Sequence, residues 1–277
     1  MGGCCRNTDT REMRIKMSFL KAFCIAFSIY SRIPVPQFKW EKKDMQYHLI
    51  FFPFVGTLIG GLLVIWDMVC SYIGASPLVC TCIGTAIPVI VTGGFHIDGF
   101  MDTMDAFKSY KSKEEKLMIL KDPHIGAFSV IMLAAWGLCY MGAYSYICET
   151  DKAGSGILFV FVGIFFLSRI LSAITVVSFK NAKKDGMLHE FKDSAVSKKG
   201  FVRVILIFEL AACLIYMFLF DWILGVLIFI TSVLYLIYYY IKTKKEFDGI
   251  TGDTSGFLVV SLEVILTVII AVYAAII

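Results

Sequence analysis

Charged residues are scarce in this sequence, and their scarcity indicates its class. Of 277 residues, 17% are charged and 58% are hydrophobic, whereas a soluble domain has about a quarter charged and about half apolar residues. The lysines lie in short stretches between apolar runs and form no long basic face, which excludes a typical nucleic-acid-binding protein. The sequence is therefore that of an integral membrane protein.

Paired cysteines and internal repeats are also missing. The nine cysteines have no paired spacing, and Cys80 and Cys82 lack the second ligand pair that a zinc site needs. Most of the cysteines lie in apolar runs, as small buried residues do. These absences argue against a disulfide framework and against a structural zinc site.

A cleavable signal peptide is not evident either. The apolar stretch 23–30 leads into Arg32 rather than into a small-residue cleavage site. Met17 could equally be the natural start of the chain. We therefore expect residues 1–16 to be a disordered N-terminal extension and residues 17–277 to form one membrane domain.

Seven segments are long and apolar enough to span a bilayer, which takes about 20 residues. Their approximate bounds are 49–73, 77–95, 126–148, 155–178, 201–219, 222–241 and 256–277. The apolar run of segment 18–36 is too short, and Pro34 breaks a helix there, so we predict that this segment lies in the membrane interface. The predicted fold is an all-α, polytopic bundle of about seven transmembrane helices with an N-terminal interfacial helix.

Lysine and arginine gather in alternate connections between the predicted spans. The rich set comprises the N-terminus and the stretches 37–48, 96–125, 179–200 and 242–255; the poor set comprises 71–76, 149–154 and 220–221, with Lys152 alone. Because basic loops stay on the cytoplasmic side, the pattern predicts an inward N-terminus and an outward C-terminus. In the first span, Gly56, Gly60 and Gly61 predict close approach of another helix.

Three aspartates form the clearest functional motif. Asp98, Asp102 and Asp105 are spaced i, i+4 and i+7, which places their carboxylates on one face of a helix. Such like charges repel one another unless a cation compensates, and hard oxygen ligands select Mg²⁺, Mn²⁺ or Ca²⁺. The alternative is a solvated helix face, but the apolar flanks and adjacent glycines favour a metal site.

The stretch 121–126 carries residues suited to the same chemistry. Asp122 could be another metal ligand, Lys121 a phosphate contact, and His124 a hydrogen-bonding or proton-transfer group. The alternative is a turn and a helix-start cap before the next span. The stretch alone does not decide between them.

The last inward stretch, 247–256, is rich in glycine and hydroxyl residues. Asp253 could bind metal, while Thr251 and Thr254 could bind phosphate oxygens. Glycines such as Gly252 let backbone amides face an anion at the start of a helix. The alternative is a helix cap by Asp253 or Thr254.

Charged residues also occur inside the predicted spans. Intramembrane charges are costly and indicate function by default, which makes Arg169 and Glu263 candidate site residues. The alternative is a structural ion pair of Arg169 with Glu209 or Glu263. We assign no function to Glu209.

Five blocks, in order from about residue 18 to the end, resemble the adenosylcobinamide-GDP ribazoletransferases, also called cobalamin-5′-phosphate synthases. They are 31–36; 52–56 with Gly60; 93–99 with Asp102 and Asp105; 121–127; and 249–253 with Gly256 and Glu263. Two departures are Asp248, where the family has a second glycine, and Ala106, where it often has glycine.

The resemblance implies an enzyme that joins the two halves of the cobamide nucleotide loop. The implied substrates are adenosylcobinamide-GDP and α-ribazole or its 5′-phosphate, and the products are adenosylcobalamin, or its 5′-phosphate, and GMP. The implied cofactor is Mg²⁺, and the implied location is the bacterial inner membrane with the site facing the cytoplasm. The inward loops could also dock a second copy or other cobamide-assembly enzymes, but no motif indicates either.

On this basis the site residues receive roles. The metal ligands are Asp98, Asp102 and Asp105, joined by Asp122, Asp253 and Glu263. The phosphate or substrate contacts are Lys121, Arg32, Arg169, Thr251, Gly252 and Thr254. His124 or one of the aspartates takes the proton of the attacking hydroxyl.

Three other functions fit parts of the pattern. A CDP-alcohol phosphotransferase also uses a membrane aspartate cluster, but there Asp-Gly is followed by Ala-Arg, and here by Phe100 and Met101. A membrane prenyltransferase would need paired aspartate motifs, which Asp248 and Asp253 imitate imperfectly. A transporter could use Arg169 and Glu263, but seven spans give no inverted-repeat symmetry.

Overall fold

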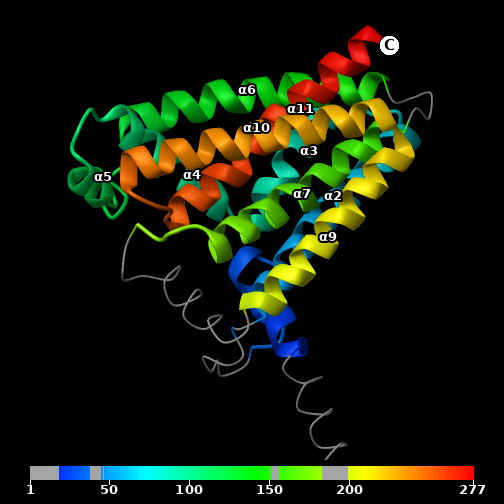
Figure 1. Ribbon diagram of the computed structural model, residues 1–277. Helices are drawn as coiled ribbons and strands as arrows, with labels where there is room; N and C mark the ends of the chain where they lie inside the picture. Colours follow the sequence, from blue (N-terminus) through cyan, green and yellow to red (C-terminus); the bar gives the residue numbers. More distant parts are fainter. Residues whose placement is uncertain (1–18, 38–44, 46, 151–155, 183–198) are drawn as a thin grey trace, which may run out of the picture.

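The computed structural model describes residues 19–37, 45, 47–150, 156–182 and 199–277. Within these ranges the protein is built of helices without regular strands, which confirms the all-α prediction (Figure 1). The helices are Phe19–Tyr30, α2 (His48–Ile73), α3 (Pro77–Thr92), α4 (Phe95–Lys108), α5 (Lys113–Ile119), α6 (Ala127–Thr150), α7 (Ile157–Ser178), α9 (Lys199–Phe220), α10 (Trp222–Phe247) and α11 (Gly252–Ile276).

Six of these helices are long and apolar enough to cross a membrane. They are α2, α6, α7, α9, α10 and α11, and the number rises to seven if the bent pair of α3 and α4 counts as one span. The predicted polytopic membrane bundle is therefore confirmed. The predicted N-terminal extension, 1–16, lies outside the described residues.

The predicted span 77–95 is wrong as a single straight helix. Helix α3 ends at Thr92, and α4 leaves at an angle of 92°. Gly93 and Gly94 make the break because their φ angles are 62° and 79°, a left-handed conformation that glycine adopts without a steric penalty. With 16 residues, α3 is about 24 Å long, shorter than the hydrocarbon core of about 30 Å.

The N-terminal segment forms a short apolar helix, Phe19–Tyr30, and its location in the membrane interface remains a prediction. Its residues Ala22, Ile25 and Ala26 are buried. After the helix, the backbone N–H of Arg32 donates to the carbonyl of Val91, at 2.8 Å. The segment is thus attached to the end of α3, beside the α3–α4 bend.

Helix α7 lies at the centre of the core and is buried along most of its length. It packs on α2 at two of the predicted glycines, because a Cβ on Gly56 would lie 2.1 Å from the Phe165 carbonyl oxygen and one on Gly60 would lie 2.9 Å from that of Val162. The prediction is wrong for Gly61, whose Cβ position faces open space. Figure 1 shows α2, α7 and α9 side by side, inclined to α6, α10 and α11.

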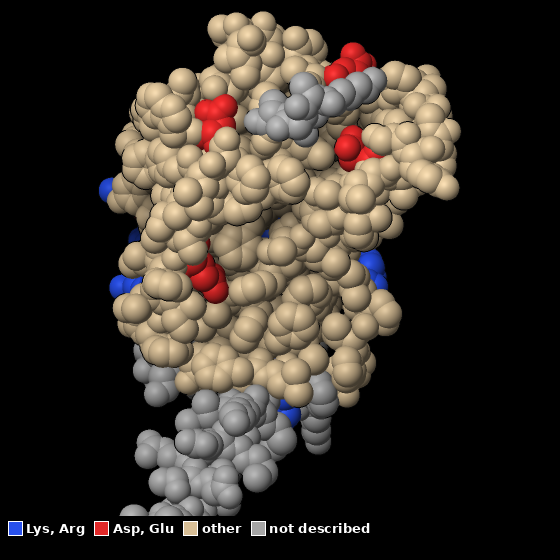
Figure 2. Space-filling view, turned by 90° about the vertical axis from the view of Figure 1, so that its right-hand side faces the viewer, with Lys and Arg blue, Asp and Glu red and all other residues tan. Residues whose placement is uncertain are grey.

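The two ends of the bundle differ in what they present. Helix α5 lies at one end, where α4 and the connection from α10 to α11 also lie, and the C-terminus lies at the other (Figure 1). Figure 2 faces the C-terminal end, where most of the surface is neither acidic nor basic and Lys and Arg appear mainly near the edges. Helix α4 and the start of α11, which carry most of the aspartate candidates, are at the opposite end (Figure 1).

Candidate functional site

Helix α4 carries the three aspartates as the spacing predicted. Asp98 lies in the first turn of α4, and Asp102 and Asp105 follow on the next turns. Asp98 is exposed, whereas Asp102 and Asp105 are half-buried. A helical i, i+4, i+7 spacing places them on one face, so the predicted common face is confirmed.

The start of α4 borders a cavity of about 540 Å³. Both Arg32 and Asp98 line it, together with Ser28, Ile29, Ser31, Thr92, Gly93, Gly94, Phe95, Ile97 and Met101. The Arg32 side chain lies directly on Gly93, where a Cβ would be 2.2 Å from its Nε. The glycine pair therefore bends the chain and also leaves room for the Arg32 guanidinium in the cavity that Asp98 lines.

Helix α11 meets α4 beside the aspartates. A Cβ on Gly99 would lie 2.8 Å from the backbone oxygen of Asp253, and one on Gly256 would lie 2.9 Å from that of His96. This close approach requires glycine on both helices. Two inward stretches, distant in sequence, are thereby packed together, and Asp253 lies against the helix that carries Asp98 and Asp102.

The chemistry of these donors fits a hard divalent cation that shares its ligands with a substrate. Within the described ranges, no group of three or more His, Cys, Asp and Glu side chains is arranged to hold a metal ion. Mg²⁺ usually takes one or two carboxylates and completes its shell with substrate phosphates and water. Asp98, open to the cavity, and Asp102, one turn further along α4, supply such carboxylates.

Asp105 has a structural task that the sequence did not indicate. Its Oδ2 accepts from the backbone N–H of Gly126 at 2.8 Å, and its Oδ1 accepts from that of Ser129 at 3.0 Å. A Cβ on Gly126 would collide with this carboxylate at 2.3 Å. Asp105 therefore caps the start of α6 and fixes the position of the 121–126 turn relative to α4.

The 121–126 turn is exposed, and two of its candidate residues bind each other. Oδ1 of Asp122 accepts from the His124 backbone N–H at 3.0 Å and lies 2.6 Å from His124 Nδ1. These two hydrogen bonds from His124 lower the pKa of Asp122 below its ordinary value. Lys121 is exposed on the same turn. The turn is thus a surface feature, as the alternative of a turn before the next span predicted. The catalytic roles of its residues remain predictions.

Two predicted phosphate contacts, Thr251 and Thr254, instead form the start of α11. Thr251 is the N-cap, and the hydroxyl of each threonine accepts from the other's backbone N–H, at 3.1 and 2.8 Å. Both are buried, and Tyr239 donates to the Thr254 hydroxyl at 3.3 Å. Their hydroxyls serve this capping box, so the capping alternative holds, with Thr251 in place of Asp253 as the cap. Gly252 next to them is exposed.

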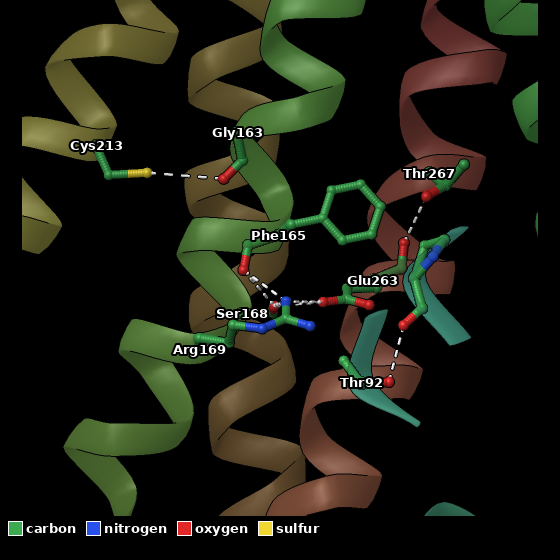
Figure 3. A network of polar contacts seen from close by, with 9 residues as sticks. Thr92, Gly163, Phe165, Ser168, Arg169, Cys213, Glu263 and Thr267 are labelled. Atoms are coloured by element: carbon green, nitrogen blue, oxygen red, sulfur yellow. Dashed lines mark hydrogen bonds and ion pairs between the residues drawn. The ribbon is translucent and has the colours of Figure 1, made fainter. Parts of the chain in front are cut away.

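The intramembrane charges Arg169 and Glu263 form an ion pair, as the alternative of a structural role predicted (Figure 3). Arg169 Nη1 lies 2.6 Å from Glu263 Oε1 and donates to the Phe165 carbonyl at 2.7 Å, while Ser168 donates to the same carboxylate oxygen at 2.7 Å. Such pairing compensates part of the cost of burying two charges. Glu263 is buried within this pair, whereas Asp98 is exposed and lines the cavity at the start of α4.

Two residues without an assigned role in the sequence also lie close to the bend. His96 is buried at the start of α4, and its ring stacks on Phe52 with centroids 5.5 Å apart. Tyr140 is buried on α6. The position of His96 inside the 93–99 block could have indicated a role for it. Nothing in the sequence around Tyr140 distinguished it from other tyrosines in apolar helices.

The family model of cobalamin-5-phosphate synthase matches residues 22–271, which is most of the chain. This chain belongs to the cobalamin-5-phosphate synthase family. The match spans the bend, the aspartate helix and the start of α11, and it decides against the phosphotransferase, prenyltransferase and transporter alternatives.

Curated relatives in this family share the name adenosylcobinamide-GDP ribazoletransferase. The protein of Lachnoclostridium phytofermentans is 38% identical over 92% of this chain and 95% of its own length. That of Clostridium perfringens is 29% identical over 88% of this chain and 95% of its own length. That of Halalkalibacterium halodurans is 28% identical over 86% and 90%. No solved structure matches this chain.

Proposed function

We propose that this membrane protein is an adenosylcobinamide-GDP ribazoletransferase, which joins adenosylcobinamide-GDP to α-ribazole or its 5′-phosphate and releases GMP. Family membership supports the reaction. The observation that carries the site is the cavity that Arg32 and Asp98 both line, next to the contact between α4 and Asp253. A cation and carboxylates side by side are what a diphosphate and its counter-ion require.

The proposed step is an in-line displacement at phosphorus. The ribazole hydroxyl oxygen forms a bond to the phosphorus attached to cobinamide, the bond from that phosphorus to the GMP oxygen breaks, and the hydroxyl proton passes to a base. Negative charge grows on the departing GMP oxygen and on the equatorial oxygens. Arg32 can bind those phosphate oxygens because it lines the cavity and is exposed. A guanidinium is well suited to this contact since it binds phosphate through two N–H groups.

Carboxylates on α4 and α11, of which Asp98 lines the cavity, complete the proposed site. Asp98 and Asp102 would hold Mg²⁺, and Asp253 lies on the neighbouring helix. When bound, Mg²⁺ would neutralise diphosphate charge and stabilise the leaving oxygen. Asp98 is also the exposed carboxylate nearest in sequence to the bend, which makes it the first candidate to accept the hydroxyl proton. Lys121 and His124, on the exposed turn, would act only if the turn closes over the substrate.

We also propose that this end of the bundle faces the cytoplasm of a bacterial cell. Lysines accumulate here: Lys116 of α5 and Lys242 of α10 both pair with Glu246, at 2.5 and 3.0 Å. Basic segments are retained on the cytoplasmic side of bacterial membranes. A nucleotide substrate made in the cytoplasm would then reach the cavity without crossing the bilayer.

The test is a turnover assay on purified protein in lipid nanodiscs. Adenosylcobinamide-GDP, α-ribazole and Mg²⁺ are supplied, and GMP and the joined corrinoid are measured by chromatography. We expect the two products in equal amounts, with none when Mg²⁺ is chelated and full recovery when it is restored. If properly folded protein forms neither product with α-ribazole or its 5′-phosphate, the proposed function is wrong.

A further inference from the structure

A second cavity, of about 210 Å³, lies between helices of the bundle and is partly open. Its walls come from α3, α6, α7 and α11 and from the start of α4. Most of the lining is apolar: Pro88, Val89, Ile97, Leu133, Trp136, Phe165, Val259, Val260 and Val264. It touches the first cavity, because Thr92 and Ile97 line both.

Several polar atoms on the walls of this cavity have no hydrogen-bond partner among the described residues. They are both ring nitrogens of His96, the Tyr140 hydroxyl, the Thr85 hydroxyl and Arg169 Nε. The exposed fractions of His96, Tyr140 and Arg169 are 5%, 8% and 1%. A buried polar group without a partner costs about 1–3 kcal/mol, so this group of atoms points to a ligand that supplies partners.

The shape and chemistry of the cavity restrict that ligand. It is smaller than the roughly 300 Å³ of a small drug-sized pocket, so it suits one ring system and not a whole nucleotide. The walls offer an indole and a phenyl ring, from Trp136 and Phe165, and donors on Tyr140 and Arg169. An apolar aromatic heterocycle with an acceptor nitrogen matches these features.

We propose that this second cavity binds the aromatic base of ribazole. The ring lies among Trp136 and the apolar side chains, and its free ring nitrogen accepts a hydrogen bond from Tyr140 or from Arg169 Nε. The ribose then points past Thr92 and Ile97 into the first cavity, where its hydroxyl meets the phosphate held near Asp98. The inference rests on the proposed function, since it names the place of one of its two substrates.

The site also gives the Arg169–Glu263 pair a consequence beyond stability. The pair uses Arg169 Nη1 and leaves Nε on the cavity wall. Glu263 holds the guanidinium in place, so the Nε–H is oriented before the base arrives. In this arrangement Arg169 contacts the base of a substrate and not a phosphate.

Two glycines of α6 allow a matched test. Gly137 lines the cavity, and a Cβ there meets no atom within 4 Å. Gly142 is on the same helix and is equally open, but it does not line the cavity. Gly137→Leu should fill the cavity without a clash, and Gly142→Leu adds the same side chain outside it. Tyr140→Phe, which removes one donor and keeps the ring, is the second variant.

The measurement is equilibrium binding of radiolabelled α-ribazole to full-length protein in nanodiscs, together with KM for each substrate. We expect Gly137→Leu to weaken α-ribazole binding at least tenfold and Tyr140→Phe about fivefold, with Gly142→Leu within twofold of wild type. KM for adenosylcobinamide-GDP should stay within twofold in all three. If Gly137→Leu fails to fold, the result of Tyr140→Phe decides.

The outcomes separate this inference from the proposed function. Unchanged α-ribazole affinity in Gly137→Leu and Tyr140→Phe, with normal wild-type turnover, overturns the inference and leaves the function standing. Binding that depends on the cavity, without turnover in the wild type, supports the site and overturns the function. A co-purified lipid that native mass spectrometry detects in wild type and not in Gly137→Leu, with ribazole affinity unchanged, makes the cavity a lipid site and overturns the inference.

Discussion

The acidic residues of this protein fall into two environments that differ in what surrounds the carboxylate. Asp98 is exposed and lines an open cavity with Arg32. Glu263 is buried inside the bundle and is bound by Arg169 and Ser168. The i, i+4, i+7 spacing made Asp98 a metal-ligand candidate, and the intramembrane position and the family block made Glu263 one. Both carboxylates border a cavity, but Asp98 is exposed there, whereas Glu263 is 8% exposed and is bound by a guanidinium and a hydroxyl. The comparison teaches that an exposed carboxylate is available for chemistry, whereas a buried and paired one is held in place by its partners.

Asp98 and Asp105 repeat this contrast within one helix. Both lie on the same face of α4, seven residues apart. Asp98 borders the cavity, while the two oxygens of Asp105 accept the backbone N–H groups of Gly126 and Ser129 at the start of α6. The same residue type at the same helical register thus has two different tasks, and only the neighbouring chain decides which.

The largest effect on activity should come from Asp98. In Asp98→Asn the shape is kept and the charge is lost, so turnover should fall about 100-fold or more, as when one transition-state contact is removed. The assay is GMP release by purified protein. The thermal unfolding temperature serves as the control and should equal that of wild type. Retained turnover would show that Asp98 is not part of the site, and the functional contrast between Asp98 and Glu263 would be wrong.

The largest effect on stability should come from the buried pair. Arg169→Met leaves Glu263 without its cation and should destabilise the protein by about 3–5 kcal/mol. Replacing both residues with methionine should restore most of that loss, because no uncompensated charge remains buried. Reversible denaturation in mixed micelles measures both variants. A double variant as unstable as the single one would show that the pair itself, and not the unpaired charge, matters.

Asp105 tests whether capping or metal binding explains its position. Asn also accepts N–H groups at a helix start, whereas Ala does not. Asp105→Ala should therefore cost about 1 kcal/mol. Asp105→Asn keeps one of the two acceptor oxygens, so it should cost less stability than Asp105→Ala and stay within about tenfold of wild-type turnover. The two variants are compared by unfolding and by GMP release. An activity loss in Asp105→Asn as large as that in Asp98→Asn would instead make Asp105 a metal ligand.

The smallest effect is expected at the exposed pair of Lys180 and Asp248, whose charged atoms are 2.6 Å apart. The hydrogen bond from Lys180 lowers the pKa of Asp248. The folded pKa is below the unfolded one, so the stabilisation is present above the ordinary aspartate pKa of about 3.9 and is lost as pH falls through the folded value. Water and salt screen this pair. Asp248→Asn should change the neutral-pH unfolding temperature less than any variant above. A larger change would show that Asp248, which stands where the family has glycine, is important for stability.

Much of the fold was predictable because membrane spans can be recognised from long runs of apolar residues. The positions of α2, α6, α7, α9, α10 and α11 follow from apolar length, since about 20 apolar residues are needed to cross a bilayer. The failure at 77–95 has a physical reason: apolar length cannot distinguish a straight helix from one that breaks at Gly93 and Gly94. The glycine packing at Gly56 and Gly60 was predictable, but the position of Gly61 on the open side of α2 depended on where α7 lies.

The helix face that the three aspartates share was predictable, the arrangement of the other candidate residues only partly, and the site roles themselves stay predictions. The i, i+4, i+7 spacing determined that Asp98, Asp102 and Asp105 share a helix face, because helical geometry is local. The capping by Thr251 and Thr254 was an open alternative, since a hydroxyl that caps and one that binds phosphate look alike in sequence. The turn at 121–126 was equally undecided.

The sequence by itself determined a multi-span helical membrane protein of the cobalamin-5-phosphate synthase family, because apolar length, helical spacing and ordered motifs are properties of the chain alone. Only the tertiary structure decided which charges meet. It paired Arg169 with Glu263, bound the Asp105 carboxylate to the backbone at the start of α6, brought Arg32 and Asp98 to one cavity, and brought His96 and Tyr140 to a second cavity. These contacts join residues far apart in the chain, and they depend on how closely the helices pack.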